Sequence, residues 1–269
     1  MAMFRNRADA LAYVERIPFL EARWYHPGRL ATVDFLVVHT MENTEASDKA
    51  EQWQAMTATQ DRESSVHCGV DNDSTRMAVH HWDTAYHVGK GNRNTWGCEH
   101  AGRAAQASAD WSDPYSRAML EGQSAPLFAA MCLIADIPIR RANTFDYMAS
   151  RPDLGGMGWH EGRRGILGHV DVARAIQRFG LSDSGHTDPG EQFPYPWFLD
   201  RVRSHLEDDD MTPEQYLEMM KTKDYKDRMK VIVDDVVEAR IGNVAKKPGT
   251  VSTVYEAARQ AIRDTPPKS

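Results

Sequence analysis

The feature that most constrains the fold is a short apolar run at residues 33–38, with the sequence VDFLVV. Its length and its β-branched residues predict a buried strand, because helices usually extend over about ten or more residues. Two more strands are predicted at 65–71 and 76–81, joined as a hairpin by the turn-forming residues DNDS. A fourth is predicted at 95–102, so the chain is expected to build a sheet.

Helices are predicted between and after these strands. Asp113 followed by Pro114 is typical of an N-cap with proline at the first helical position, and this helix is expected to reach residue 136. The stretch 140–165 contains five glycines and is predicted to be irregular, and loops of such length are often functional. Other helices are predicted over 8–17, over 43–58 and at the end of 193–206.

The composition argues against several classes of protein. The 269 residues carry a formal net charge of −7, whereas a general nucleic-acid binder needs a basic face. The first twenty residues are charged and have no apolar core, so no Sec signal peptide is expected. The longest apolar run, Leu127–Ala135, is far shorter than the roughly 20 residues of a membrane helix, so no membrane insertion is expected. The cysteines are too few for a disulfide framework and are expected to be buried thiols, at Cys68, Cys98 and Cys132.

Eleven histidines are the most unusual part of the composition. A single histidine is more often a hydrogen-bonded structural residue than a ligand, but His39 and His169 each follow an apolar run of strand type, and strand ends are rigid and reachable. Asp188 lies in the tight turn Thr-Asp-Pro-Gly, which is expected to direct its carboxylate outward. Two histidines and one carboxylate would suit Zn²⁺ and leave a fourth position for water or substrate. Their wide spacing in the sequence alone does not bring the three together.

Six motifs occur in a specific order along the chain: VDFLVVHT, SSVHCGVD, AYHVGKGN, TWGCEHAG, GILGHVDVA and HTDPGEQFPYPWFL. In this order they resemble the type-2 N-acetylmuramoyl-L-alanine amidase family, which includes the peptidoglycan recognition proteins and the phage T7 lysozyme. The resemblance covers roughly residues 23–204 and implies an α/β fold, with a central mixed β-sheet flanked by helices. The stretches WSDPYSRAML and RGILGHVDVARA are most similar to amidase endolysins of actinobacteriophages.

The resemblance implies a role for each matching residue. His39, His169 and Asp188 match the zinc ligands of the family. Glu99, in GCEHAG, matches its strand glutamate and would carry the proton chemistry, while His186 could stabilise the oxyanion.

Three further residues are expected at the substrate. His87 matches a family histidine near the bound glycopeptide, and His67 and Trp96 are also expected to contact substrate. For His67 and Trp96, packing within the protein is the alternative interpretation. A tyrosine of the T7-like branch is replaced by Val66, which would leave Glu99 as the lone proton-transfer group.

The function implied is that of a zinc-dependent amidase that cleaves peptidoglycan between N-acetylmuramic acid and L-alanine. A phage endolysin would stay in the host cytoplasm until holin-mediated release and would then act on the cell wall. The alternatives are a non-catalytic peptidoglycan-binding module, a zinc peptidase that cuts within the stem peptide, and a cytoplasmic amidase that recycles wall fragments.

The character of the chain changes near residue 207. Residues 208–269 contain no tryptophan, are rich in charge and carry apolar residues at helical spacing. The chain is therefore divided into a catalytic domain of residues 1–207 and a helical C-terminal extension of residues 208–269. Because its apolar stripe must be buried, the extension is expected to pack on the domain, to form a homo-oligomer or to bind the cell wall.

Overall fold

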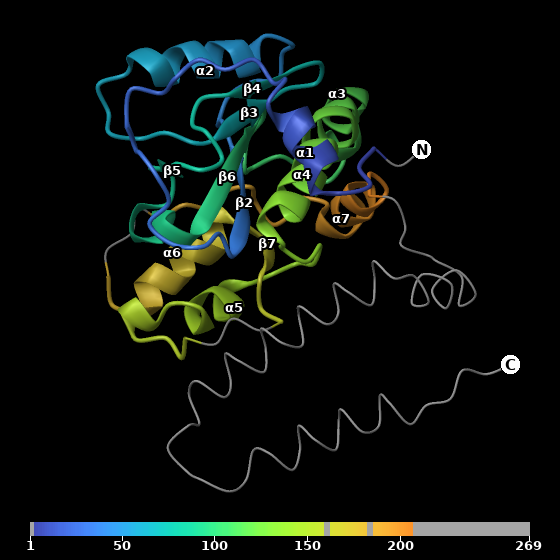
Figure 1. Ribbon diagram of the computed structural model, residues 1–269. Helices are drawn as coiled ribbons and strands as arrows, with labels where there is room; N and C mark the ends of the chain where they lie inside the picture. The colour runs from blue at the N-terminus through green and yellow to red at the C-terminus, as the bar shows by residue number, and fades with distance from the viewer. Residues whose placement is uncertain (1–2, 159–161, 182–184, 207–269) are drawn as a thin grey trace, which may run out of the picture. The chain divides into compact units, whose positions relative to one another are not determined.

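The computed structural model describes residues 3–158, 162–181 and 185–206, and the predicted extension of residues 208–269 lies outside this part of the chain. The centre is a five-stranded sheet (Figure 1). In spatial order its strands are β4 (Thr75–Met77), β3 (Cys68–Val70), β6 (Thr95–His100), β2 (Phe35–Thr40) and β7 (Gly165–Gly168). The pairs β3–β6, β6–β2 and β2–β7 are parallel, and β4 is antiparallel to β3. The predicted central mixed sheet is confirmed.

Strand β2 lies in the parallel part of the sheet and is buried along its whole length. Helices cover both faces of the sheet, which explains why the run at 33–38 is apolar without alternation. The register places Val37 beside Gly97, and His39 beside Glu99. Because side chains alternate along a strand, the odd-numbered residues of β2 and β6 share one face and the even-numbered residues share the other.

The even-numbered face carries the larger core. Three helices cover this face, namely α1 (Arg7–Val14), α4 (Ala125–Ala135) and α7 (Tyr195–Arg203) (Figure 1). Leu36 and Val38 of β2 and Trp96 of β6 pack here against Phe128 and its neighbours. The three cysteines are free and buried, as predicted.

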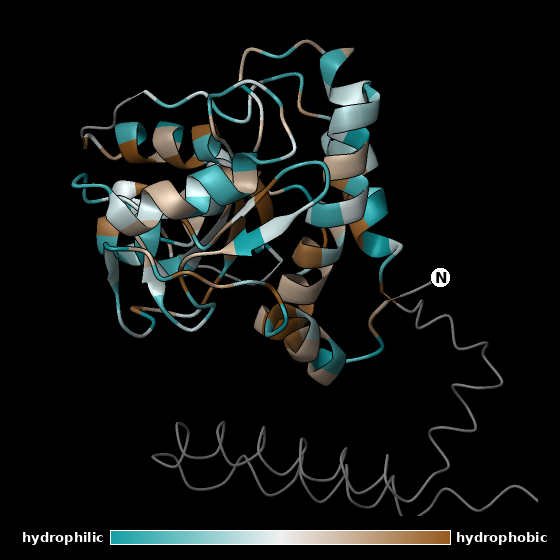
Figure 2. Ribbon diagram, turned by 90° about the horizontal axis from the view of Figure 1, so that it is seen from above, coloured by the Kyte–Doolittle hydropathy of each residue, from teal (hydrophilic) through white to brown (hydrophobic). Residues whose placement is uncertain are grey.

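The odd-numbered face is covered by α5 (Thr144–Ala149) and α6 (His169–Arg178), which form a smaller core with Phe35, Val37 and Leu167. Helix α2 (Lys49–Thr59) lies against β3 and β4. Its Trp53 approaches Gly69 so closely that a Cβ at position 69 would lie 2.5 Å from the indole Cε3 atom. Figure 2 shows that the outer helices carry both hydrophilic and hydrophobic residues, as expected for helices with one buried face.

The predicted helix at 113–136 is confirmed in extent but not in type. It comprises α3 (Pro114–Arg117), the π-helical η3 (Ala118–Ser124) and α4. The wide π-turns end two residues before Pro126, which lacks the N–H that a regular α-helix would use. The span Pro114–Ala135 is long and apolar enough to cross a membrane, but core helices meet the same criterion and 67% of its most apolar window is buried inside the protein.

Some elements were not predicted. Helix α5 lies within the stretch 140–165 that was expected to be irregular, although Asn143 caps it by accepting hydrogen bonds from the Phe145 and Asp146 amides. The two-residue strands β1 (Tyr25–His26) and β5 (Thr84–Ala85) pair antiparallel and are too short to show a periodicity. The second hairpin strand, predicted over 76–81, ends at Met77. The remaining short helices are η1 (Gly89–Asn94), η2 (Asp110–Ser112) and η4 (Pro152–Leu154).

The larger core provides a test of the fold. Phe128 is fully buried and its ring packs against Trp96 and Phe198, with centroid distances of 6.0 and 5.2 Å. Phe128→Ala is expected to lower the free energy of unfolding by about 3–5 kcal/mol, because it leaves a cavity that the sheet and helices cannot close. The matched control is Phe145→Ala at a ring that is 54% exposed, with an expected loss of about 1 kcal/mol or less. Urea unfolding measures both, and equal losses would contradict this packing.

Candidate metal centre and active site

Two histidines reach the site from neighbouring strands. His39 is the fifth residue of β2, and its side chain lies on the odd-numbered face. His169 begins α6 directly after β7. The junction is stabilised by Asp171, which accepts a hydrogen bond of 3.0 Å from the amide of Gly168. Because β2 and β7 are paired, both imidazoles are held at the same end of the sheet.

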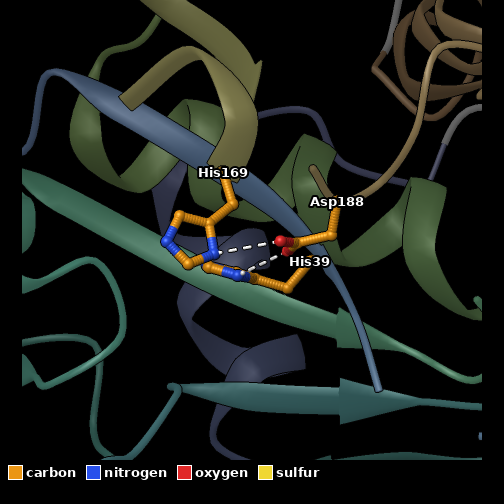
Figure 3. Close-up of side chains that lie close together, drawn as sticks. All are labelled: His39, His169 and Asp188. Atoms are coloured by element: carbon orange, nitrogen blue, oxygen red, sulfur yellow. Dashed lines mark hydrogen bonds and ion pairs between the residues drawn. The ribbon is translucent and has the colours of Figure 1, made fainter. Parts of the chain in front are cut away.

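Asp188 comes from a turn outside the sheet. The Gly190 amide donates to the Thr187 carbonyl at 2.9 Å, and the Val170 amide donates to the Asp188 carbonyl at 3.0 Å. The second bond ties the turn to the first residues of α6. The carboxylate was predicted to point outward, but this is wrong: Asp188 is only 7% exposed and lies between the two histidines (Figure 3).

The donor atoms of these three residues converge. Nδ1 of His39 lies 3.1 Å from Oδ2 of Asp188, and Nδ1 of His169 lies 3.2 Å from Oδ1 (Figure 3). All three donor atoms lie within 4.8 Å of one another. Two ligands of a tetrahedral Zn²⁺, each about 2.0–2.1 Å from the ion, are separated by about 3.3 Å. The residues present therefore fit a zinc ion, and three protein ligands would leave its fourth position open.

The protonation states also suit a cation. Burial lowers the pKa of His39 to about 4, so its imidazole is neutral near pH 7. Burial raises the pKa of Asp188, but the hydrogen-bonding contacts with His169, His186 and His39 outweigh this effect and hold that pKa below its usual range. A neutral imidazole and an ionised carboxylate are the forms that bind metal ions.

Glu99 lies beside the ligands on the same face of the sheet, in register with His39. Its Oε2 atom is buried and has no hydrogen-bond partner among the residues that the structure describes. Burial raises the pKa of this carboxyl well above its ordinary value, and the charges of Asp188 and Glu42 raise it further. A carboxyl with a raised pKa next to a metal site is suited to accept and return protons.

His186 lies at the outer side of the cluster. Its ring stacks on that of His169 with centroids 3.9 Å apart, and its Nδ1 atom is 3.5 Å from Oδ1 of Asp188. Its side chain is 37% exposed, more than any of the three ligand candidates. The ring is therefore placed beside the cluster and can be reached from solvent.

The three residues predicted at the substrate have different surroundings. His87 lies over Gly97 and contacts His39, with 2.8 Å between His87 Nδ1 and His39 Nε2. His67 is fully buried: its Nδ1 accepts from the Gly97 amide at 3.1 Å, and its Nε2 donates to the Asp83 carbonyl at 3.2 Å. Trp96 is also fully buried and stacks on His67. Direct substrate contact by His67 and Trp96 is therefore not supported by their placement, which matches the packing alternative.

Two polar residues at the site were not singled out from the sequence. Thr95 lies on the odd-numbered face and contacts Nε2 of His87 through its hydroxyl at 2.9 Å. His100, on the opposite face, bridges the His39 carbonyl and the Ser124 hydroxyl, at 3.0 and 2.7 Å. Strand alternation in TWGCEH could have placed Thr95 on the same face as Glu99. No sequence pattern indicates that His100 contacts Ser124 in η3.

Comparison with known families agrees with this geometry. The sequence profile described as N-acetylmuramoyl-L-alanine amidase matches residues 29–191, which is more than half of the chain and contains His39, His169 and Asp188. The chain belongs to the N-acetylmuramoyl-L-alanine amidase family. The predicted membership is confirmed, and peptidoglycan is the substrate that this family implies. No curated protein sequence matches the chain.

Several solved structures are similar to this family member. The Staphylococcus aureus hydrolase AmiA, in complex with its ligand, is 13% identical, with a TM-score of 0.49, covering 77% of this chain and 98% of that one. PlyL is 15% identical, with a TM-score of 0.43, covering 71% and 98%. A mutant endolysin from Bacillus subtilis is 12% identical, with a TM-score of 0.41, covering 69% and 99%.

The metal centre can be tested by zinc titration of chelator-treated protein. Free zinc at 100 times its Kd is expected to add about 2.7 kcal/mol to the free energy of unfolding, because the ligand cluster exists in the folded state. For a domain of this size, that corresponds to a rise in Tm of roughly 5–10 °C. Asp188→Ala should abolish the rise, whereas Asp61→Ala, at an aspartate whose side chain is 94% exposed, should retain it. Equal stabilisation of both variants would place the zinc elsewhere.

Proposed function

We propose that this chain is a zinc-dependent N-acetylmuramoyl-L-alanine amidase that hydrolyses the amide bond between the lactyl group of N-acetylmuramic acid and L-alanine. The observation that carries the proposal is the convergence of His39, His169 and Asp188 beside the unpartnered carboxyl oxygen of Glu99. Membership of the amidase family supports the same reaction. A binding module without catalysis would not need a complete set of ligands next to a carboxyl with a raised pKa.

The amide bond is a poor electrophile with a poor leaving group, so the site must activate both the carbonyl and the attacking water. A bound Zn²⁺ would supply this electrophilic activation. Glu99 would accept the proton of the attacking water and return it to the departing amine. The raised pKa makes this carboxylate a stronger base toward the proton of the attacking water.

His186 is proposed to stabilise the negative charge that develops on the carbonyl oxygen. Its ring is accessible, and its stacking on His169 fixes its orientation beside the cluster. A donor aimed at the developing oxyanion contributes more than one aimed at the substrate carbonyl, because only the former favours the transition state.

The biological setting is proposed to be cell lysis by a phage endolysin. The sequence resemblance to endolysins of actinobacteriophages supports it. The enzyme would accumulate in the host cytoplasm and reach the wall after holin-mediated release. Residues 208–269, which lie outside the described part of the chain, are proposed to add wall binding or self-association.

Digestion of purified sacculi tests the bond that is cleaved. The expected products are stem peptides with a free L-alanine amino terminus and glycan strands with free lactyl carboxyl groups, identified by mass spectrometry. New amino termini within the stem peptide would instead indicate a peptidase. If no peptide is released, the chain is a peptidoglycan-binding module without catalytic activity. Cleavage of soluble muropeptides with intact sacculi untouched would favour a wall-recycling enzyme over a lysin.

The role of Glu99 is tested by Glu99→Gln, which keeps the shape of the side chain but cannot take up a proton. We expect the rate on sacculi to fall roughly 100- to 10,000-fold, while the zinc content stays at one ion per chain. The matched control is Glu51→Gln, at a glutamate that pairs with Arg76 on the far edge strand β4, and its rate should stay near wild type. Wild-type activity in Glu99→Gln would exclude Glu99 as the base.

A further inference from the structure

A continuous line of polar contacts leads away from His39 on the side opposite to Asp188. Nε2 of His39 lies 2.8 Å from Nδ1 of His87, and Nε2 of His87 lies 2.9 Å from the hydroxyl of Thr95. That hydroxyl lies 3.0 Å from the backbone carbonyl of Gly91. The line therefore contains two imidazoles and one hydroxyl, and it ends on a group that can only accept a hydrogen bond.

The Gly91 carbonyl at the end of this line determines which group donates in each of its hydrogen bonds. A threonine hydroxyl has one proton, and if Thr95 donates it to the Gly91 carbonyl, the hydroxyl oxygen is left to accept from His87. His87 then carries its proton on Nε2, so its Nδ1 accepts from Nε2 of His39. In a neutral imidazole only one nitrogen bears a proton, so Nδ1 of His39 presents its lone pair to the metal-ligand cluster.

The opposite direction is the competing arrangement. His39 would then donate from Nδ1 to Asp188, His87 would donate from Nδ1 to His39, and Thr95 would donate to His87. This arrangement leaves the Gly91 carbonyl without the threonine proton and covers the lone pair that a metal requires. The two arrangements hold the same number of protons, and a cation between His39 and Asp188 is compatible with the first alone.

The position of His87 depends on its surroundings. The amides of His87 and Val88 donate to Oδ1 of Asn92, at 2.9 and 2.7 Å, which fixes the backbone at the start of η1. Gly97 leaves the space for the imidazole, because a Cβ at that position would lie 2.4 Å from Nδ1 of His87. Both ring nitrogens of His87 are thus engaged inside the protein, so neither is available for a polar contact with substrate.

We propose that His87 is a positioning residue: anchored by Thr95 and the Gly91 carbonyl, it holds His39 in the Nε2–H tautomer and directs the Nδ1 lone pair at the metal. The proposal rests on the zinc site proposed above, but not on the identity of the bond that is cleaved. Groups that hydrogen-bond the second nitrogen of a histidine ligand orient the ring and increase its basicity.

The affinity for zinc tests the proposal independently of catalysis. Thr95→Val keeps the shape of this buried side chain but removes the acceptor for His87, and we expect zinc affinity, measured by chelator competition, to fall about 10- to 100-fold. Thr95→Ser keeps the hydroxyl and should bind zinc like the wild type. His87→Ala should weaken binding similarly, while His87→Gln, whose amide oxygen can accept from His39, should recover part of the loss.

The tautomers themselves are the second readout. In zinc-loaded wild-type protein with ¹⁵N-labelled histidine, long-range ¹H–¹⁵N spectra should show His39 and His87 both protonated at Nε2. Protonation of His87 at Nδ1 would overturn the proposal even if Thr95→Val failed to fold. So would a Thr95→Val protein that is folded and binds zinc within about twofold of wild type. If the wild-type protein binds zinc and shows both Nε2–H tautomers but does not cleave sacculi, the proposed amidase function is refuted and the proposed role of His87 is not.

Discussion

The parallel pairing of β2 with β6 is the constraint on which the rest of the site depends. It places His39 beside Glu99, and two residue pairs earlier it places Val37 beside Gly97, where the glycine leaves room for His87. A register shift of one residue would move the side chains of one strand to the opposite face and so separate His39 from Glu99. The residues that the sheet contributes to the site are therefore held by strands that helices bury on both faces.

The histidines serve two purposes in this structure. His39 and His169 offer Nδ1 atoms to the metal cluster, whereas His67 joins the Gly97 amide to the Asp83 carbonyl, and His100 joins the His39 carbonyl to the Ser124 hydroxyl. Imidazole suits the second purpose because one ring can donate and accept at the same time. The abundance of histidine that first indicated a metal site therefore has two physical causes.

Much of the fold could be predicted from the sequence, because hydrophobic runs, turn residues and caps are local signals. Alternation in TWGCEH, for example, is enough to place Cys98 and Glu99 on opposite faces, where the structure has them. The direction of the Asp188 carboxylate could not be predicted, because a turn sequence defines a local bend and not the side on which the protein lies. The contact between His87 and the Thr95 hydroxyl could not be predicted either, because it depends on which ring nitrogen of His87 faces the strand that carries Thr95. Helix α5 was missed despite its capping residue Asn143, because the surrounding glycines dominated the pattern.

The three candidate metal ligands lie far apart in the sequence, and this separation affects how a bound ion would stabilise the chain. His39 comes from β2 and His169 from the start of α6, directly after the paired strand β7, while Asp188 comes from a turn that lies 149 residues beyond His39 in the chain. An ion held by all three is therefore a cross-link between distant parts of the chain, comparable in kind to a disulfide bridge. Unlike a disulfide, this link exists only in the folded chain, so it stabilises the fold through the free energy of metal binding and not by restricting the unfolded chain. Because the three cysteines are free, a bound metal ion would supply between the sheet and the turn a reversible link of a kind that no disulfide supplies in the described part of the chain.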